Sequence, residues 1–103
     1  MNISLDYDDT YTRDKYLWNA FIQFAIASGH TVYCVTMRSH AEGDDVRRDL
    51  SHLVKDIIFT SRRAKKETCY KMGVHIDVWI DDMPLFVIQN APFSAEYDLR
   101  LGN

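Results

Sequence analysis

Three carboxylates, from Asp6, Asp8 and Asp9, and the hydroxyl of Thr10 lie close together near the N-terminus. They directly follow a short apolar segment that can form a buried first strand. At an effective dielectric constant near 20, two carboxylates about 4 Å apart repel each other by roughly 4 kcal/mol. That repulsion is relieved if the side chains diverge into water, or if a hard cation such as Mg²⁺ binds between them. The stretch therefore indicates either an acidic turn, with Asp9 capping a loop, or a metal site.

Polar groups also follow the later apolar segments of the chain. They are Thr36 and Arg38 after the second segment, Arg62, Arg63, Lys65 and Lys66 after the third, and Asp81 and Asp82 after the fourth. Carboxylates can hold Mg²⁺ or attack phosphorus, a hydroxyl can hold a phosphoryl oxygen, and a lysine can offset developing negative charge. Together these residue types favour a site for phosphoryl transfer over a set of ordinary polar surface residues.

Alternating strands and helices are expected to position these groups. Apolar and β-branched runs predict strands at 1–6, 31–36, 57–60, 78–80 and 85–88, and helical spacing predicts helices at 14–28, 44–53 and 65–72. The residues beyond Asn90 are not assigned. This alternation predicts an α/β fold with a doubly wound, mostly parallel, five-stranded sheet between two helical layers. Ligands bind at the carboxyl ends of the strands in such sheets, where the polar groups lie.

The first predicted helix is the most strongly patterned. Leu17, Trp18, Phe21 and Phe24 recur in it at helical spacing. Asp14 is a plausible N-cap, and the glycine at position 29 suits the left-handed conformation that ends many helices. We expect Trp18 and Phe21 to be core residues and not a platform for a ligand.

Length and composition limit the classes of protein to which the chain can belong. With 103 residues, 47% of them hydrophobic, residues 1–103 are expected to form one folded domain. A net charge of −3 excludes a global affinity for nucleic acid or anionic membranes, although a local basic patch is compatible with it. Cys34 and Cys69 lack metal-ligand spacing and are read as buried thiols of a cytoplasmic protein. With no apolar run approaching about 18 residues and no leader pattern, neither membrane insertion nor export is expected.

The motifs resemble those of the haloacid dehalogenase (HAD) superfamily of Mg²⁺-dependent phosphohydrolases. The resemblance covers nearly the whole chain and lies in Asp6-x-Asp8-x-Thr10, Thr36 at a strand end, a lysine opening the third helix, and Asp81-Asp82 after the fourth strand. It implies a Rossmann-like three-layer α/β/α fold with strand order 5-4-1-2-3. That order sets the first strand between those carrying Thr36 and Asp81.

The resemblance also implies a role for each motif residue. Asp6 is the nucleophile that forms an aspartyl-phosphate, and Asp8 protonates the leaving oxygen and then activates water. Mg²⁺ is held by Asp6, the backbone carbonyl of Asp8 and Asp81, with Asp82 close by. Thr36 binds the phosphoryl group. The motif-three lysine is Lys65 or Lys66, and Lys65 is favoured because it opens the helix.

Several of these residues have ordinary structural explanations as well. Thr36 can be a plain strand-end residue, Asp82 can cap the turn before Pro84, and Thr10 can order its loop without touching substrate. Arg38 can clamp a substrate phosphate through two hydrogen bonds or be an ordinary exposed arginine.

The sequence departs from the HAD pattern in two ways. Asp9 occupies a position that is usually glycine, and there is no room for a cap domain, because few residues separate Thr10 from the first helix or the third strand from Lys65. An uncapped crevice favours a bulky substrate. Arg62, Arg63, Lys65 and Lys66 are expected to form a basic rim for the phosphate of a nucleotide or nucleic acid, or else a solvated helix face.

Three other functions fit parts of the pattern. A receiver domain of two-component signalling also has clustered aspartates, a threonine and a lysine, but its phosphorylated aspartate follows the third strand, where this chain has Thr60-Ser61-Arg62. A catalytically inactive HAD-like scaffold keeps the fold without the activity. A phosphotransferase passes the phosphoryl group to an acceptor other than water. An oligomer is possible, and the sequence does not determine the oligomeric state.

Overall fold

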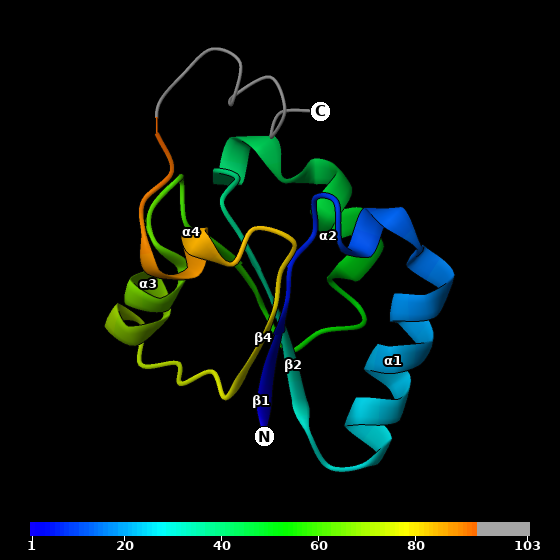
Figure 1. The fold of residues 1–103 in the computed structure, drawn as a ribbon. Coiled ribbons are helices and arrows are strands. Elements are labelled where there is room, and N and C mark those ends of the chain that lie inside the picture. Colours follow the sequence, from blue (N-terminus) through cyan, green and yellow to red (C-terminus); the bar gives the residue numbers. More distant parts are fainter. Residues whose placement is uncertain (93–103) are drawn as a thin grey trace.

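A four-stranded parallel sheet forms the centre of the molecule (Figure 1). The computed structural model describes residues 1–92. The strands are β1 (Asn2–Leu5), β2 (Thr31–Thr36), β3 (Ile57–Phe59) and β4 (Val78–Ile80), in the order β3-β2-β1-β4. All three neighbouring pairs are parallel. The central β1 therefore lies between the strands that lead to Thr36 and to Asp81.

Helices cover both faces of this sheet. They are α1 (Lys15–Ala27), α2 (Asp44–Leu50), α3 (Lys65–Lys71) and α4 (Leu85–Ile88), with 3₁₀ turns η1 (Tyr11–Arg13) and η2 (His40–Glu42). In Figure 1, α1 and α2 lie on one side of the sheet and α3 and α4 on the other. Separate apolar clusters fill the two sides, one around Leu5, Ile22 and Leu50 and another around Val35 and Cys69. The predicted α/β class with a parallel sheet is confirmed.

Helix α1 begins and ends as its sequence predicts. The Asp14 carboxylate accepts a hydrogen bond from the Leu17 backbone N–H at 3.0 Å, which satisfies one of the free donors of the first turn. At the other end Gly29 has a φ of 89°, a conformation that costs glycine little. Between them, Ile22 and Ala25 are buried against the sheet.

Trp18 and Phe21, the two residues of α1 predicted to belong to the core, pack against it as predicted, while other apolar residues of the helix are exposed. Trp18 and Phe21 pack against the main cluster, whereas Leu17 is 52% exposed and Phe24 is 77% exposed. A sheet covers only one side of a helix, and α1 has more apolar positions than that side can hold. The sequence pattern therefore combined two different faces of the helix.

The segment predicted as the fifth strand is helical instead. Leu85–Ile88 forms the short helix α4, whose N-cap, Pro84, has a φ of −62° that suits the start of a helix. Phe86 is buried beside Met37, and Val87 is buried as well. A run of four apolar residues has no period that distinguishes a strand from a buried helical turn, which explains the error. Among residues 1–92 the sheet thus has four strands, and the unassigned C-terminal residues after 92 lie outside the described part.

Short connections join the elements around the carboxyl edge of the sheet. Residues 6–14, including η1, link β1 to α1, and residues 60–64 link β3 to α3. Neither connection holds an inserted domain, so the edge is not covered from these two positions. None of the helices within residues 1–92 is long and apolar enough to cross a membrane.

Candidate active site

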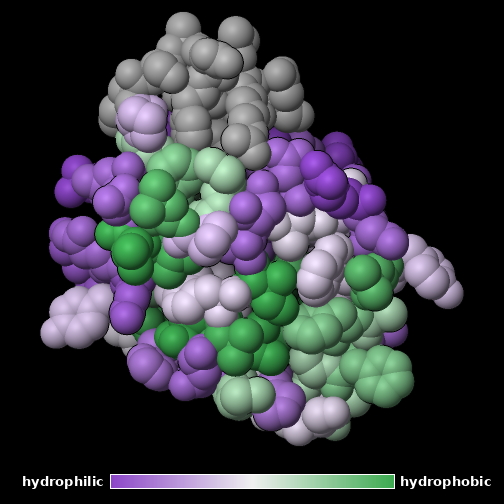
Figure 2. Space-filling model, in the orientation of Figure 1, coloured by the Kyte–Doolittle hydropathy of each residue, from purple (hydrophilic) through white to green (hydrophobic). Residues whose placement is uncertain are grey.

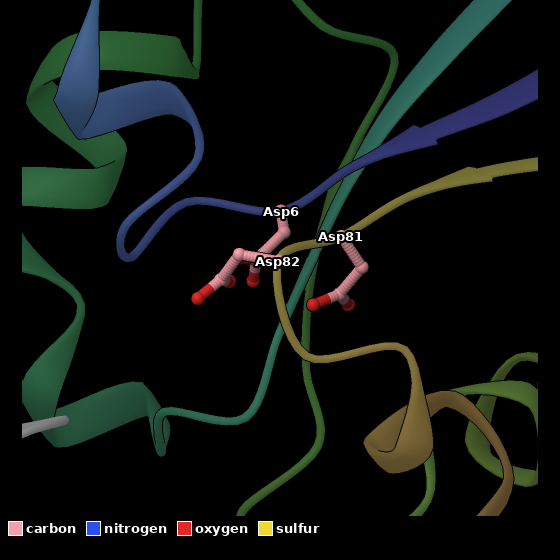
Figure 3. A group of neighbouring side chains, drawn as sticks. All are labelled: Asp6, Asp81 and Asp82. Atoms are coloured by element: carbon pink, nitrogen blue, oxygen red, sulfur yellow. The ribbon is translucent and has the colours of Figure 1, made fainter.

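Three carboxylates meet at the carboxyl edge of the sheet. Asp6 follows β1, while Asp81 and Asp82 follow the adjacent β4. Figure 3 shows their side chains projecting from the ends of these strands to the same side. The backbone fixes this arrangement, because the Asp6 N–H donates to the Ile80 carbonyl at 3.0 Å. One oxygen from each residue lies within 4.8 Å of the others, so residues far apart in sequence form one cluster.

Lys65 provides the positive charge in this cluster. It is the first residue of α3, and its side chain is only 3% exposed. Its Nζ lies 2.7 Å from Asp6 Oδ1 and 2.5 Å from Asp81 Oδ2. The neighbouring Lys66 is exposed on the same helix. Of the two lysines considered from sequence, the structure therefore brings Lys65 to the carboxylates.

The cluster has three carboxyl groups and one ammonium group, and the pKa of Asp6 is raised. Burial is the main cause that raises its pKa, to about 8; Lys65 opposes the shift and Asp81 adds to it. Burial alone would lower the pKa of Lys65, but Asp6 and Asp81 outweigh it, and the pKa of Lys65 rises. A protonated lysine thus faces several carboxyl groups, and Asp6 retains a proton near neutral pH until more positive charge arrives.

Thr10 connects the two acidic strand ends. Its hydroxyl donates to Asp6 Oδ2 at 3.1 Å and accepts from the Asp82 backbone N–H at 3.2 Å. The Met83 N–H donates to Asp81 Oδ1 at 2.9 Å, leaving that residue's other oxygen with Lys65. Thr10 therefore orders the loops around the cluster and fixes one oxygen of Asp6.

The three carboxylates fit a magnesium ion by donor type and by spacing. Mg²⁺ prefers oxygen ligands at about 2.0–2.1 Å, so oxygens on opposite sides of one ion are about 4.2 Å apart. One oxygen from each of the three residues lies within 4.8 Å of the others, so the cluster is compact enough for all three to approach a single ion. The Lys65 ammonium between Asp6 and Asp81 also demonstrates that this place attracts a cation.

Asp8 lies apart from this cluster and is paired with Arg38. The guanidinium donates from Nε to Asp8 Oδ2 at 3.0 Å and from Nη2 to Asp8 Oδ1 at 2.7 Å. Its Nη1 donates to Asp45 Oδ1 at 2.7 Å and to the Glu42 carbonyl at 2.9 Å, and its carbon Cζ is 5.2 Å from the centre of the Tyr7 ring. Arg38, considered from sequence as a phosphate clamp, is thus buried and bound to protein groups. Its contacts hold the loops after β1 and β2 together.

A second buried arginine connects the loop after β3. Arg62 donates to both carboxylate oxygens of Glu42, at 2.5 and 2.9 Å. Glu42 also accepts from the Ser39 N–H at 2.8 Å, which forms a capping box around η2. Neither Glu42 nor Asp45 was identified from sequence as a site residue. The Ser39-x-x-Glu42 spacing was the available signal for Glu42.

The predicted basic rim is only partly exposed. Lys65 and Arg62 are buried in ion pairs, whereas Arg63 and Lys66 are exposed on the surface. Thr36 is fully buried at the end of β2, and its hydroxyl accepts from the Arg38 N–H at 3.3 Å. Of the four rim residues, Arg63 and Lys66 therefore remain accessible to an anionic ligand, whereas Arg62 and Lys65 do not.

The Glu42–Arg62 pair predicts an acid-sensitive loss of stability. The hydrogen bonds from Arg62 lower the pKa of Glu42 from 4.5 to about 2. A carboxyl group whose pKa is lower in the folded protein stabilises the fold at pH values above its pKa in the unfolded chain. This contribution disappears as pH falls from about 4.5 to about 2. After a discount for partial exposure, Glu42→Gln is expected to cost about 2 kcal/mol at pH 7 and under half of that at pH 3.

Denaturant unfolding at the two pH values measures this difference. Glu67→Gln is the matched control, because Glu67 forms an exposed pair with Lys71 on α3, and solvent screens such pairs strongly. An equal cost of Glu42→Gln at pH 3 and pH 7 would show that the pair does not carry the effect.

No family model matches this chain, and searches of curated proteins and of solved structures give no match either.

Proposed function

We propose that the protein is a Mg²⁺-dependent phosphohydrolase of the HAD type, with Asp6 as nucleophile. The observation that carries the proposal is the convergence of Asp6, Asp81 and Asp82 in one cluster, in which the Lys65 ammonium contacts both Asp6 and Asp81. This combination is costly for a purely structural site, because the two carboxyl groups of Asp6 and Asp81, whose side chains are nearly inaccessible to solvent, share one cation. It suits a site that receives a further cation and an anionic substrate.

Each residue has a defined task in the proposed reaction. A carboxylate oxygen of Asp6 attacks phosphorus, the bond to the leaving oxygen breaks, and an aspartyl-phosphate forms. Water then attacks the phosphorus of this intermediate, the bond to Asp6 breaks, and inorganic phosphate leaves. Lys65 keeps Asp6 oriented and offsets negative charge as the phosphoryl group arrives. When bound by Asp6, Asp81 and Asp82, Mg²⁺ neutralises phosphoryl oxygens and screens the approach of one anion to another.

Asp8 is the residue proposed to move the proton. It gives a proton to the leaving oxygen and takes one from the attacking water. Both of its oxygens accept hydrogen bonds from Arg38, so one of these bonds must open for a leaving group to reach it. Arg38 is therefore assigned to positioning Asp8 and not to binding substrate.

The substrate is proposed to be a bulky phosphate ester, such as a nucleotide or a phosphorylated nucleic-acid end. The short connections at residues 6–14 and 60–64 hold no cap inserted at either position. Arg63 and Lys66 flank Lys65 closely in sequence and are exposed, so they can contact a phosphate backbone.

Phosphate release measured with and without Mg²⁺ tests the proposed activity. An aryl phosphate reports on the chemistry alone, and oligonucleotides with 3′ or 5′ phosphates report on the substrate class. Nucleic-acid turnover is expected to fall steeply as salt rises, while aryl phosphate turnover changes little. The double variant Arg63→Gln with Lys66→Gln should reduce turnover of the oligonucleotides and leave turnover of the aryl phosphate unchanged. Absence of Mg²⁺-dependent release from every substrate contradicts the proposal.

Magnesium is expected to stabilise the protein more at pH 8 than at pH 6. Mg²⁺ requires ionised carboxylates, and the pKa of Asp6, raised to about 8, means that a proton competes for the site at lower pH. The rise in Tm caused by a fixed Mg²⁺ concentration should therefore grow across this interval.

Thermal unfolding of the wild type, Asp82→Asn and Asp44→Asn, each with and without Mg²⁺, separates binding at this site from general ionic effects. Asp82→Asn removes one carboxylate without touching the two ion pairs of Lys65, and it should reduce the rise in Tm. Asp44→Asn removes an exposed carboxylate on α2, far from the cluster in sequence, and should leave the rise unchanged. Equal effects of Mg²⁺ on all three proteins would place the ion elsewhere.

A further inference from the structure

The outward side of α1 is an apolar surface that no part of residues 1–92 covers. Four exposed residues form its centre, spaced three, four and three positions apart: Leu17, Ala20, Phe24 and Ala27. This spacing places them in a single stripe along the helix. Figure 2 shows apolar side chains gathered over α1, at the right of the molecule. We call these four residues the α1 stripe.

The exposed area around the stripe reaches the size of a small protein interface. Tyr16, which lies next to the stripe on the helix, is 88% exposed, and within the stripe Leu17 is 52% and Phe24 is 77% exposed. Because a buried aromatic side chain contributes roughly 150–250 Å², Tyr16 and Phe24 together offer about 300 Å². With the aliphatic side chains the total is about 500 Å² per copy. Two such surfaces bury about 1,000 Å², the lower limit for a specific complex.

The absence of charge on this surface favours a second copy of the same chain. Residues 16–37 contain no Asp, Glu, Lys or Arg, although 26% of the whole chain is charged. An exposed helix face normally carries such residues. In a twofold interface the same surface of each copy meets its counterpart, so a face of one charge sign would meet that same sign. An uncharged face avoids this repulsion and offers nothing to a highly charged partner.

The sizes of the stripe residues are also complementary to themselves. We propose that two copies of α1 pack antiparallel in a homodimer, about a twofold axis at the level of Ile22. In this arrangement Leu17 faces the partner's Ala27, and Ala20 faces the partner's Phe24. Each large side chain therefore meets a small one, which lets two helices approach closely. A parallel pairing would place Phe24 against Phe24 and leave a gap between the alanines.

Sedimentation equilibrium of the full chain from about 1 to 100 μM tests this dimer. The wild type is expected to be dimeric within this range. Phe24→Glu should weaken association by at least about 30-fold, because it buries an unpaired charge at the centre of the interface. Tyr70→Glu is the matched control, since Tyr70 is an equally exposed aromatic residue on α3, outside the stripe. It should leave the association unchanged.

A charge-pair variant tests the antiparallel arrangement. Ala20→Lys alone should also weaken the dimer. The double variant Ala20→Lys with Phe24→Glu should restore it, because the new ammonium of each copy faces the new carboxylate of the other. In a parallel pairing like charges would meet, and the double variant would stay monomeric. Circular dichroism checks that each variant is folded.

Specific results would overturn the proposal. One is a wild type that stays monomeric at 100 μM, whether or not it binds another protein or vesicles. The other is a Phe24→Glu variant that dimerises like the wild type. A double variant that remains monomeric overturns the antiparallel pairing. All of these measurements are independent of phosphatase activity, so failure of the proposed function leaves them unaffected.

Discussion

Asp6→Asn is expected to lower Mg²⁺-dependent phosphate release by at least about 1,000-fold. The amide oxygen of asparagine is a poor nucleophile, and no other carboxylate occupies the same place at the end of β1. The substitution also removes one of the three charged oxygen donors from the metal cluster. Initial rates with an aryl phosphate at saturating Mg²⁺ measure the loss.

The same variant should fold at least as well as the wild type without metal. Because burial raises the pKa of Asp6 to about 8, far above its unfolded value near 3.8, folding opposes ionisation of this carboxyl group. A raised carboxyl pKa costs stability that increases as pH rises from about 4 to about 8. Asparagine has no such cost, so its Tm relative to wild type should increase over this interval.

This combination of lost activity and preserved folding separates the alternatives. A catalytically inactive scaffold would show no Mg²⁺-dependent release in either protein. A contaminating phosphatase would give equal activity in both. If Asp6→Asn keeps most of the activity of the wild type, Asp6 is not the nucleophile and the proposed mechanism is wrong.

The sequence was sufficient to predict the α/β class and the acidic strand ends. Strands such as Thr31–Thr36 are continuously apolar because the sheet is covered on both faces, and that pattern is directly visible. The parallel arrangement then requires Asp6 and Asp81 to lie at one edge. Lys65 was favoured over Lys66 through the resemblance, because it opens the helix, whereas its contact with Asp81 was not predicted.

Other features depend on tertiary contacts that a single sequence does not encode locally. The segment Leu85–Ile88 has no period, and burial of Phe86 and Val87 together with Pro84 made it helical. Arg38 was considered as a phosphate ligand because it lies two residues past Thr36, at the end of a strand. Its actual partners, Asp8 and Asp45, come from two other loops. Likewise, the two apolar faces of α1 became distinct only when the sheet covered one of them.

Lys65→Met is expected to destabilise the metal-free protein by about 3–5 kcal/mol at pH 8. Removing one partner of a buried ion pair leaves the other charge uncompensated, and here Asp6 and Asp81 both lose their cation. The cost should be smaller at pH 6, because Asp6 then holds a proton and needs no partner. Chemical denaturation at the two pH values measures this change.

Lys66→Met is the matched control for this substitution. Lys66 follows Lys65 directly on α3 and is exposed, so its replacement should change the free energy of unfolding by no more than about 0.5 kcal/mol. It should also keep the turnover of an aryl phosphate. If Lys66→Met abolishes turnover and Lys65→Met does not, the assignment of the two lysines is reversed.

Added Mg²⁺ distinguishes the structural role of Lys65 from its role in the reaction. The ion provides positive charge to the same carboxylates, so it should recover a large part of the lost stability in Lys65→Met. It should not recover phosphate release, because methionine provides no charge beside the phosphoryl group bound to Asp6. Lys65→Arg should also remain slow, since the larger planar guanidinium does not fit between Asp6 and Asp81 as a point charge does. Full activity of Lys65→Met with Mg²⁺ would limit Lys65 to a structural role.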